Sequence, residues 1–375
     1  MASVEASGRH GGNLAAAARE LGRPPSALLD ASASLVPFAP GPRLHLAAAT
    51  AAMGWRLRTY PDRELRSLRA VIARHHGLEP GWVLPGNGAA ELITWAGRDA
   101  AAAGISALPA PGFGDYGRAL DCWGGASRPW PLPLQWDSGF PQVLPEPPEA
   151  EVIWITNPHN PTGQLWDQAS LRRLLARHRL VICDEAFLPL VAGGEAHSLI
   201  PWLGEHHQLV VLRSLTKLYG LAGLRLGYAL GHPDRLARWQ GWRDPWPVNG
   251  LAAAIGERLL EDPRRHRRHC ERVQRWCSDE GSWLSRGLAS LGEGREALTP
   301  LPSAANFLLV RAERSLLPLR QTLAERHGIL LRDCRSFAGL DSRWLRISLQ
   351  DRRGNRRLLR SLRKEWGLET TTPGR

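Results

Sequence analysis

The sequence predicts an α/β fold with two lobes. Short apolar runs near residues 105, 130, 153, 181 and 210 are interpreted as buried strands, and helical patterns separate most of them. Strands that alternate with helices favour a mainly parallel sheet with helices on both faces. The 375 residues also suffice for one large and one smaller hydrophobic core. We expect a large domain over residues 46–250 and a small domain made of 1–45 and 251–375.

The remaining elements follow from local patterns. An alanine-rich helix is expected over 14–21, and a proline-rich linker over 30–42 crosses between the lobes. The segment Asp244-Pro-Trp-Pro-Val-Asn249 ends the alternation and begins a long helical region. The smaller lobe then takes its strands from 306–310, 328–331 and 344–349, and the N-terminal segment is expected to join it.

Bulk composition is that of a globular protein in water. Hydrophobic residues make up 43% of the chain and charged residues 22%. No apolar run reaches the roughly 18 residues that a membrane span requires, and the first residues do not resemble a signal peptide. Five cysteines at irregular spacing favour reduced thiols. We therefore expect a cytoplasmic protein without a membrane partner.

The net charge of +12 raises the question of a nucleic-acid partner. The excess lies in 264–268 and 352–364, yet no helix-turn-helix, zinc ribbon or aromatic–basic interleaving accompanies it. We interpret these segments as solvated helix faces and expect no nucleic-acid partner. His266, His269, Cys270 and Cys277 have spacings that fit no common zinc pattern, so no metal is expected either.

One lysine stands out in an arginine-rich chain. An apolar strand over 209–212 runs through a short hydroxylated turn into Lys217, and Arg225 follows eight residues later. Lys217 and Lys364 are the only lysines in the sequence. Because arginine does not deprotonate, it cannot form an imine, and Lys364 belongs to the basic C-terminal helix. Lys217 is therefore the candidate for amine chemistry.

Three further motifs place polar groups where strands end. In 82–91 a short strand, a glycine turn and a helix start present backbone N–H groups to an anion. No Gly-Lys-Ser/Thr follows, which excludes a P-loop. A strand over 151–156 runs into Asn157-Pro-His-Asn160-Pro-Thr-Gly163, and a strand over 180–183 runs into Asp184. Ligands of α/β sheets bind at this end of the strands.

Together, these four ordered motifs resemble the lysine, phosphate, asparagine and aspartate segments of fold-type I pyridoxal-phosphate (PLP) enzymes, the aspartate-aminotransferase superfamily. The resemblance covers essentially the whole chain. It implies an α/β fold whose large domain has a mainly parallel seven-stranded sheet flanked by helices, with a smaller α/β domain. It also implies PLP as the cofactor.

The resemblance assigns roles around the cofactor. Lys217 carries PLP, the Asp184 carboxylate pairs with the protonated pyridine nitrogen, and the Asn160 amide donates to the phenolic oxygen. The Phe113 ring stacks on the pyridine. The cofactor phosphate is assigned to Gly88, Ala89, Ala90, Ser214, Thr216 and Arg225, and to Tyr60 reaching across from the second subunit of a homodimer.

Two relatives fit best, namely histidinol-phosphate aminotransferase and the threonine-phosphate decarboxylase of cobalamin biosynthesis. The His10-Gly-Gly-Asn13 opening resembles the decarboxylase, in which the histidine faces the substrate phosphate. Phe187 occupies a position where aminotransferases generally have a tyrosine. By resemblance, Arg332 binds the substrate phosphate and Arg346 the α-carboxylate, and a guanidinium fork suits both anions. The implied substrate-binding residues are His10, Asn160, Arg332 and Arg346.

The function implied is decarboxylation of L-threonine O-3-phosphate to (R)-1-amino-2-propanol O-2-phosphate and CO2, with Lys217 and Asp184 as the catalytic groups. A histidinol-phosphate aminotransferase and, from another class, a basic nucleic-acid-binding regulatory protein on the same scaffold remain as alternatives. The chain departs from the family pattern at a few positions in the proline-rich linker and near Lys217. These are Ser34 and Val36 in place of asparagines, and Gly220 and Ala222 in place of serine and proline.

Overall fold

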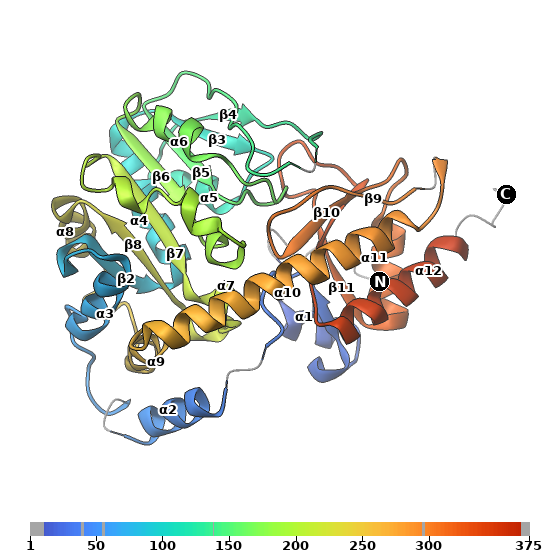
Figure 1. Ribbon diagram of the computed structural model, residues 1–375, viewed down its shortest axis with the longest axis horizontal. Helices are drawn as coiled ribbons and strands as arrows, with labels where there is room; N and C mark the ends of the chain where they lie inside the picture. Colours follow the sequence, from blue (N-terminus) through green and yellow to red (C-terminus); the bar gives the residue numbers. More distant parts are fainter. Residues whose placement is uncertain (1–10, 39–40, 55–56, 138, 295–296, 369–375) are drawn as a thin grey trace.

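The computed structural model describes residues 11–38, 41–54, 57–137, 139–294 and 297–368. His10 therefore lies outside the described residues, and its expected substrate contact stays a prediction. The described chain forms a large lobe around one sheet and a smaller lobe around another (Figure 1). The predicted two-lobed α/β architecture is confirmed. The domain limits proposed above stay a prediction.

The large sheet has seven strands in the order β2-β8-β7-β6-β5-β3-β4. Their bounds are β2 Val83–Asn87, β3 Ser106–Ala110, β4 Ser127–Pro131, β5 Val152–Thr156, β6 Leu180–Asp184, β7 Leu209–Ser214 and β8 Leu226–Gly231. Strands β4, β3, β5, β6 and β7 pair in parallel, whereas β8 is antiparallel to both β7 and β2. The mainly parallel seven-stranded sheet is thus confirmed.

Helices cover both faces of this sheet, because successive strand residues point to opposite sides. In β6, Leu180 and Ile182 pack toward one cluster while Val181 and Cys183 pack toward the other. The first cluster is completed by α4 Gly88–Ala103, α5 Asp115–Asp121 and α8 Pro233–Trp242. The second is completed by α3 Arg66–His76, α6 Gln168–Leu175 and α9 Gly250–Leu260.

The small sheet has the order β1-β11-β12-β10-β9. Its strands are β1 Leu29–Ala31, β9 Thr299–Pro300, β10 Phe307–Arg311, β11 Ile329–Asp333 and β12 Trp344–Ser348. Three helices accompany it, α1 Leu14–Glu20, α11 Leu317–His327 and α12 Arg352–Leu368. Strand β1 pairs in parallel with β11, so this part of the N-terminal segment lies in the small sheet.

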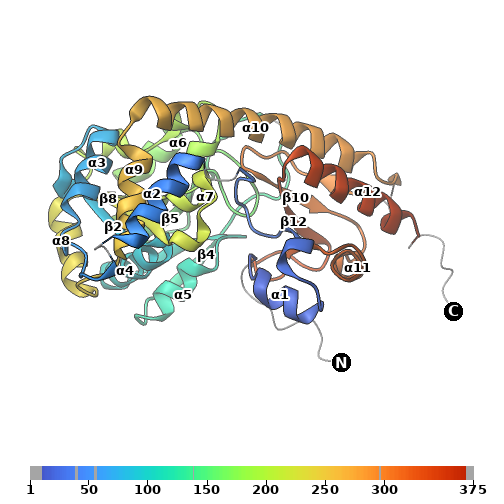
Figure 2. The same cartoon turned by 90° about the horizontal axis from the view of Figure 1, so that it is seen from below.

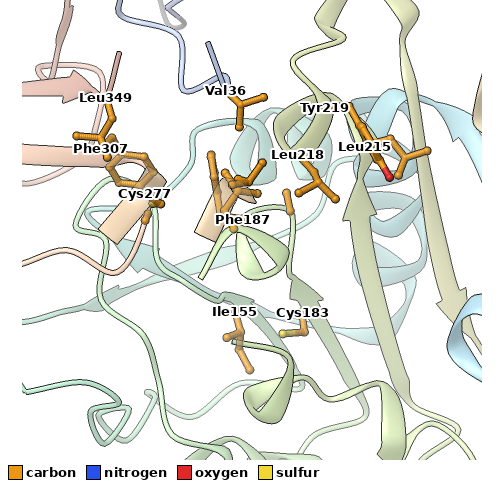
Figure 3. Close-up of a cluster of buried hydrophobic side chains, with 14 of the residues drawn as sticks. Val36, Ile155, Cys183, Phe187, Leu215, Leu218, Tyr219, Cys277, Phe307 and Leu349 are labelled. Carbon is orange, nitrogen blue, oxygen red and sulfur yellow. The ribbon is translucent and has the colours of Figure 1, made fainter. Parts of the chain in front are cut away.

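A long helix and a buried apolar cluster connect the two lobes. Helix α10, Pro263–Ala289, begins beside α9 and runs along the molecule to the small lobe (Figures 1 and 2). A buried apolar cluster lies between the lobes, with Phe187 close to Leu218 of α7 and Phe307 of β10 on its other side (Figure 3). Helix α7, Leu215–Tyr219, therefore rests on a core shared by both lobes. Helix α2, Pro42–Met53, packs on α9.

Every helix in the described ranges is too short or too polar to span a lipid bilayer. The same residues do not gather three or more His, Cys, Asp or Glu side chains into an arrangement that could hold a metal ion.

Candidate active site

A cavity of about 580 Å³ opens between the lobes at the carboxyl ends of β5, β6 and β7. Parallel strands end at the same edge of a sheet, which brings motifs from distant parts of the chain together. The predicted site residues that line this cavity are Ala89, Ala90, Phe113, Asn160, Asp184, Ser214, Thr216, Lys217, Arg225, Arg332 and Arg346.

Lys217 lies at the centre of this set. It sits in α7, directly after β7. Burial and the positive charge of Arg346 together lower the pKa of its amine to about 8, and the negative charge of Asp184 opposes both. A lysine with such a pKa has a substantial neutral fraction near pH 8 and can act as a nucleophile or accept a proton. Its Nζ lies 5.4 Å from the centre of the Phe187 ring.

The Asp184 carboxylate is held at the end of β6 by two donors. The backbone N–H of Ala186 donates to Oδ1 at 3.0 Å, and the Tyr116 hydroxyl donates to Oδ2 at 2.9 Å. Tyr116 in turn lies 2.7 Å from the Thr156 hydroxyl at the end of β5. Burial raises the pKa of Asp184, while the two hydrogen bonds and Lys217 counteract this rise. The arrangement fixes a carboxylate that can pair with a cationic ring nitrogen.

A corner of the cavity is built to take an anion. Helix α4 begins there, and its first N–H groups lack partners within the helix. The guanidinium of Arg225 approaches so closely that a Cβ on Gly88, which has φ +75°, would lie 2.7 Å from its Nη2. A Cβ on Gly227 would lie 2.7 Å from the Ala89 nitrogen. Backbone atoms at the start of α4 and the Arg225 guanidinium therefore form the walls of this corner.

Arg225 adopts a left-handed backbone conformation, with φ 55°. Such a conformation is unfavourable for a residue with a Cβ and is retained where the surroundings require it. Here it follows a single helical turn, Ala222–Leu224, and directs the arginine toward the start of α4. Ser214 and Thr216 line the same cavity as Ala89, Ala90 and Arg225, so these five members of the predicted phosphate set are brought together.

Asn160 links the large lobe to the small one. Its Oδ1 accepts a hydrogen bond from Nη1 of Arg346, whose Nη2 donates to the backbone oxygen of Ser32 at 3.2 Å. Among the described residues, the Nε of Arg346 has no hydrogen-bond partner. No carboxylate of the described residues forms an ion pair with Arg346, and burial lowers its pKa to about 10.

Arg332 stands directly opposite Arg346. The two are Cα partners in the antiparallel pair β11–β12, so their side chains leave the same face of the sheet. Both line the cavity, and the Nη2 of Arg332 donates to the Ser336 hydroxyl at 2.6 Å. Burial lowers the pKa of Arg332 too. Like charges placed opposite each other repel, and an anion between them relieves the repulsion.

Aromatic rings border the cavity on two sides. Phe113 precedes α5 and meets Tyr116 edge to face, with centroids 5.5 Å apart. Phe187 lies between Lys217 and Phe307, whose centroid is 5.3 Å from its own. Because Phe187 has no hydroxyl, it leaves the Lys217 side of the cavity without the donor that a tyrosine would supply there.

Buried polar contacts support this edge of the sheet from behind. Arg213 and Glu185 form an ion pair of 2.7 Å with both side chains buried. His159, which is fully buried between the prolines of the asparagine motif, lies 2.8 Å from the Pro111 carbonyl oxygen through its Nε2. The imidazole must donate this bond, because a carbonyl only accepts. It ties the segment of Asn160 to the segment of Phe113.

Not every predicted residue lies at the cavity wall. Gly88 does not line the cavity itself; it precedes the lining residue Ala89 and lies next to the guanidinium of Arg225. Tyr60 lies outside the cavity on the surface, 76% exposed, and stacks on Trp246 with ring centroids 4.3 Å apart. Its expected contact with the cofactor phosphate of a second subunit stays a prediction.

Several residues at the site were not predicted. The sequence alone assigned no role to Tyr116, His159 or Ser336. Tyr116 lies three residues after Phe113, at the start of a helix, so the two rings are about one helical turn apart. This spacing could have identified Tyr116 as a neighbour of Phe113. The contacts of His159 and Ser336 depend on loops whose paths the sequence does not reveal.

The described residues fit PLP. The N-terminus of α4 with Arg225 provides a place for its phosphate, Asp184 a partner for its ring nitrogen, and Lys217 an amine for its aldehyde. The glycine positions bear this out, because side chains at Gly88 or Gly227 would collide with the groups that form the cradle.

Comparison with known proteins places this geometry in context. A family model described as aminotransferase class I and II matches residues 30–362. The chain is 34% identical to the threonine-phosphate decarboxylase of Salmonella typhimurium, over 94% of this chain and 95% of that one. It is 32% identical to the histidinol-phosphate aminotransferase of Symbiobacterium thermophilum, over 88% of each.

A solved structure agrees with the fold. The histidinol-phosphate aminotransferase from Sinorhizobium meliloti, in complex with pyridoxal-5'-phosphate, matches with a TM-score of 0.78 and 24% identity over 98% of both chains. The expected fold-type I architecture is thereby confirmed.

Proposed function

The chain belongs to the aminotransferase class I and II family, whose enzymes depend on PLP, and from this we propose that it decarboxylates L-threonine O-3-phosphate. The products are (R)-1-amino-2-propanol O-2-phosphate and CO2. The overall likeness to the Salmonella typhimurium decarboxylase supports this choice, and the likeness to histidinol-phosphate aminotransferases is the reason to test it.

One observation carries the proposal. Arg346 is buried, faces Arg332 across β11–β12, and has no carboxylate partner among the described residues. A buried cation without a counter-charge is costly, so a ligand anion is the expected partner. Two guanidiniums beside Lys217 suit a substrate amine that carries two anionic groups. L-Threonine O-3-phosphate has a carboxylate and a phosphate on adjacent carbons, which matches this pair.

The residues would divide the chemistry as follows. When bound, PLP withdraws the electrons of a bond broken at the substrate's Cα. Asp184, held by Tyr116, keeps a proton on the ring nitrogen. Arg332 binds the substrate phosphate, while Arg346 and Asn160 orient the carboxylate. Binding energy from the phosphate thus selects which bond at Cα is broken. Lys217 then returns a proton to Cα.

The competing aminotransferase reading makes a different demand on the site. Transamination needs a keto acid as a second substrate and moves the Cα proton rather than losing CO2. Phe187 in place of a tyrosine favours the decarboxylase, because the Lys217 side of the cavity then lacks one hydroxyl. The alternative of a nucleic-acid-binding regulatory protein gives no role to Lys217 or Asp184, because both side chains line the cavity.

Steady-state kinetics on three amines separate these functions. The PLP-loaded enzyme would be given L-threonine O-3-phosphate, L-threonine, or L-histidinol phosphate with 2-oxoglutarate. We expect kcat/KM for the phosphorylated threonine to exceed that for threonine by about 10³, since buried charge pairs contribute several kcal/mol. Preferred turnover of histidinol phosphate with 2-oxoglutarate would instead establish the aminotransferase.

We further propose that the enzyme is a homodimer in the cytoplasm. Met53 is 82% exposed, and three more large apolar side chains between residues 46 and 60 are also exposed, namely Leu46, Leu57 and Tyr60. Large apolar side chains that stay exposed within one short stretch of the chain are the kind of surface that a second subunit covers. A second copy that covers it would carry Tyr60 toward the partner's cofactor phosphate. All five cysteines are free, which suits a reducing compartment.

Subunit mixing tests the crossing of Tyr60. The variants Lys217→Ala and Tyr60→Ala should each be nearly inactive alone. In a mixed dimer, the subunit that retains Lys217 receives Tyr60 from its partner, so one complete site forms. We expect activity to return on co-refolding. Absence of recovery in mixed dimers confirmed by mass would show that Tyr60 serves its own chain.

A further inference from the structure

The connection between β11 and β12 folds back against both arginines. It spans residues 334–343 and presents two consecutive side chains to the cavity, Ser336 and Phe337. The Ser336 hydroxyl accepts a hydrogen bond of 2.6 Å from Arg332. The Phe337 ring centre lies 5.2 Å from Cζ of Arg332 and 6.0 Å from Cζ of Arg346. One ring therefore faces both guanidinium groups.

The position of Phe337 is fixed by its own loop. Its N–H donates to the Cys334 oxygen at 2.9 Å, and its carbonyl accepts from the Leu340 N–H at 3.0 Å. Only 3% of its surface is exposed, and it packs in an apolar cluster with Leu309 and Trp344. Close-packed side chains of this kind keep a single rotamer. The ring is thus a rigid support for the arginines above it.

The arginines need such support. As directly opposed cations in a partly closed cavity they repel each other, and long side chains would otherwise turn apart toward water. A cation within about 6 Å of an aromatic face is attracted to it, more strongly when water is excluded. Phe307 holds Arg346 from a second side, with 4.8 Å between Cζ and the ring centre. Phe337 is the ring that both arginines share.

Ser336 supplies a second restraint and one free donor. Because its oxygen accepts from Arg332, its own O–H hydrogen can point to an oxygen of a bound anion. Donation from a charged group polarises the hydroxyl and strengthens that second bond. A phosphate, with three terminal oxygens, can accept from Arg332 and Ser336 together.

We propose that Ser336 and Phe337 set the spacing and the anion preference of the arginine pair, with Ser336 contacting the substrate phosphate and Phe337 acting as a positioning residue that fixes the distance between Arg332 and Arg346. This inference rests on the proposed function. It concerns selectivity among amino acids whose side chains differ in length and carry a phosphate. The 334–343 connection, rather than the cofactor-binding residues, would determine this selectivity.

Four variants test this assignment. Ser336→Ala removes the hydroxyl, and Phe337→Met keeps an apolar side chain of similar volume without a ring. Phe337→Tyr keeps the ring and should rescue. Ser342→Ala lies in the same connection but away from the cavity and is the matched control. Substrates would be the O-phosphates of L-serine, L-threonine and L-homoserine, with unphosphorylated L-threonine for comparison.

For Ser336→Ala we expect KM for L-threonine O-3-phosphate to rise about tenfold, because one hydrogen bond to a charged group is lost. We expect kcat to stay nearly unchanged. KM for L-threonine should not move. For Phe337→Met we expect the preference for the threonine phosphate over the homoserine phosphate to fall about tenfold. Phe337→Tyr and Ser342→Ala should behave as wild type.

Binding measurements separate this inference from the proposed function. Dissociation constants of L-threonine O-3-phosphate, from thermal shift of the holoenzyme, should change in Ser336→Ala and Phe337→Met as KM does. If wild type binds this compound without releasing CO2, the proposed function fails while these shifts still test the spacing. If wild type decarboxylates it and both variants keep its affinity and its selectivity, the inference is overturned.

Discussion

Tyr116 donates its hydroxyl to Asp184 across 68 residues of sequence, and both side chains are buried at the same end of the large sheet. This bond stabilises the charged form of a carboxylate whose pKa burial raises. The aspartate can therefore stay ionised at the cavity wall.

Replacing Tyr116 with phenylalanine removes that donor. The pKa of Asp184 should rise further, because the hydrogen bond from Tyr116 is one of the interactions that hold it down. Below the new pKa the protonated carboxyl cannot hold a proton on the ring nitrogen, so the acidic limb of the kcat/KM profile should move to higher pH. Tyr219→Phe is the control, because the Tyr219 hydroxyl lies beside His266 and Tyr219 does not line the cavity. An unmoved acidic limb would mean that the Ala186 N–H suffices.

His159 predicts an acid sensitivity. Burial lowers its pKa to about 4 from 6.5, so the unfolded chain binds a proton first as the pH falls. The stability contributed by this group is complete above pH 6.5 and declines between pH 6.5 and 4, by about 3 kcal/mol in total, since each pH unit between the two pKa values corresponds to about 1.4 kcal/mol. His159→Gln keeps a donor for the Pro111 carbonyl and should lack this decline. The measurement is urea unfolding of both proteins from pH 7.5 to 4.5, and parallel curves would contradict the prediction.

Lys217 should make cofactor attachment depend on pH. With a pKa of about 8, the neutral amine increases tenfold per pH unit below that value and levels off above it. The rate at which apo-protein reacts with PLP, followed by absorbance, should show the same course. Because the charge of Arg346 helps to lower this pKa, Arg346→Met should move the plateau to higher pH. A plateau near pH 10 in wild type would show that burial does not perturb the amine.

We expect Arg346 to lower the stability of the substrate-free protein and to be required for substrate binding. Arg346→Met removes a buried charge without a carboxylate partner, and water in the cavity can satisfy the Asn160 and Ser32 oxygens that it leaves. We expect the thermal midpoint without substrate to rise by about 2–4 °C, while L-threonine O-3-phosphate no longer stabilises the protein. Arg353→Met, on the exposed face of α12, should change neither. A fall of several degrees in Arg346→Met would show that protein groups already compensate the charge.

The chain predicts the residues that lie at strand ends better than those that support them. Asp184, Asn160 and Lys217 each follow a continuous apolar run, and parallel strands bring such residues to one edge whatever the loops do. Their convergence could therefore be predicted before any contact was known. Arg332 and Arg346 were found by resemblance, and their register explains why both arginines occur together.

Residues that act through a partner in a distant loop could not be predicted in this way. Phe337 gains its role from a ten-residue connection whose turns depend on packing against Trp344. Strand β1 is three residues long and pairs with β11 about 300 residues later, so no local pattern specifies it. The expected role of Tyr60 cannot be checked within one chain, because it requires a second subunit.

The most direct test is to count CO2 released per active site from L-threonine O-3-phosphate in the absence of any keto acid. The account predicts many CO2 molecules per site, one aminopropanol phosphate for each, and a cofactor that returns to its Lys217-bound absorbance. Release of no CO2, with the cofactor converted to its amine form after one turnover, would contradict it and make the protein an aminotransferase.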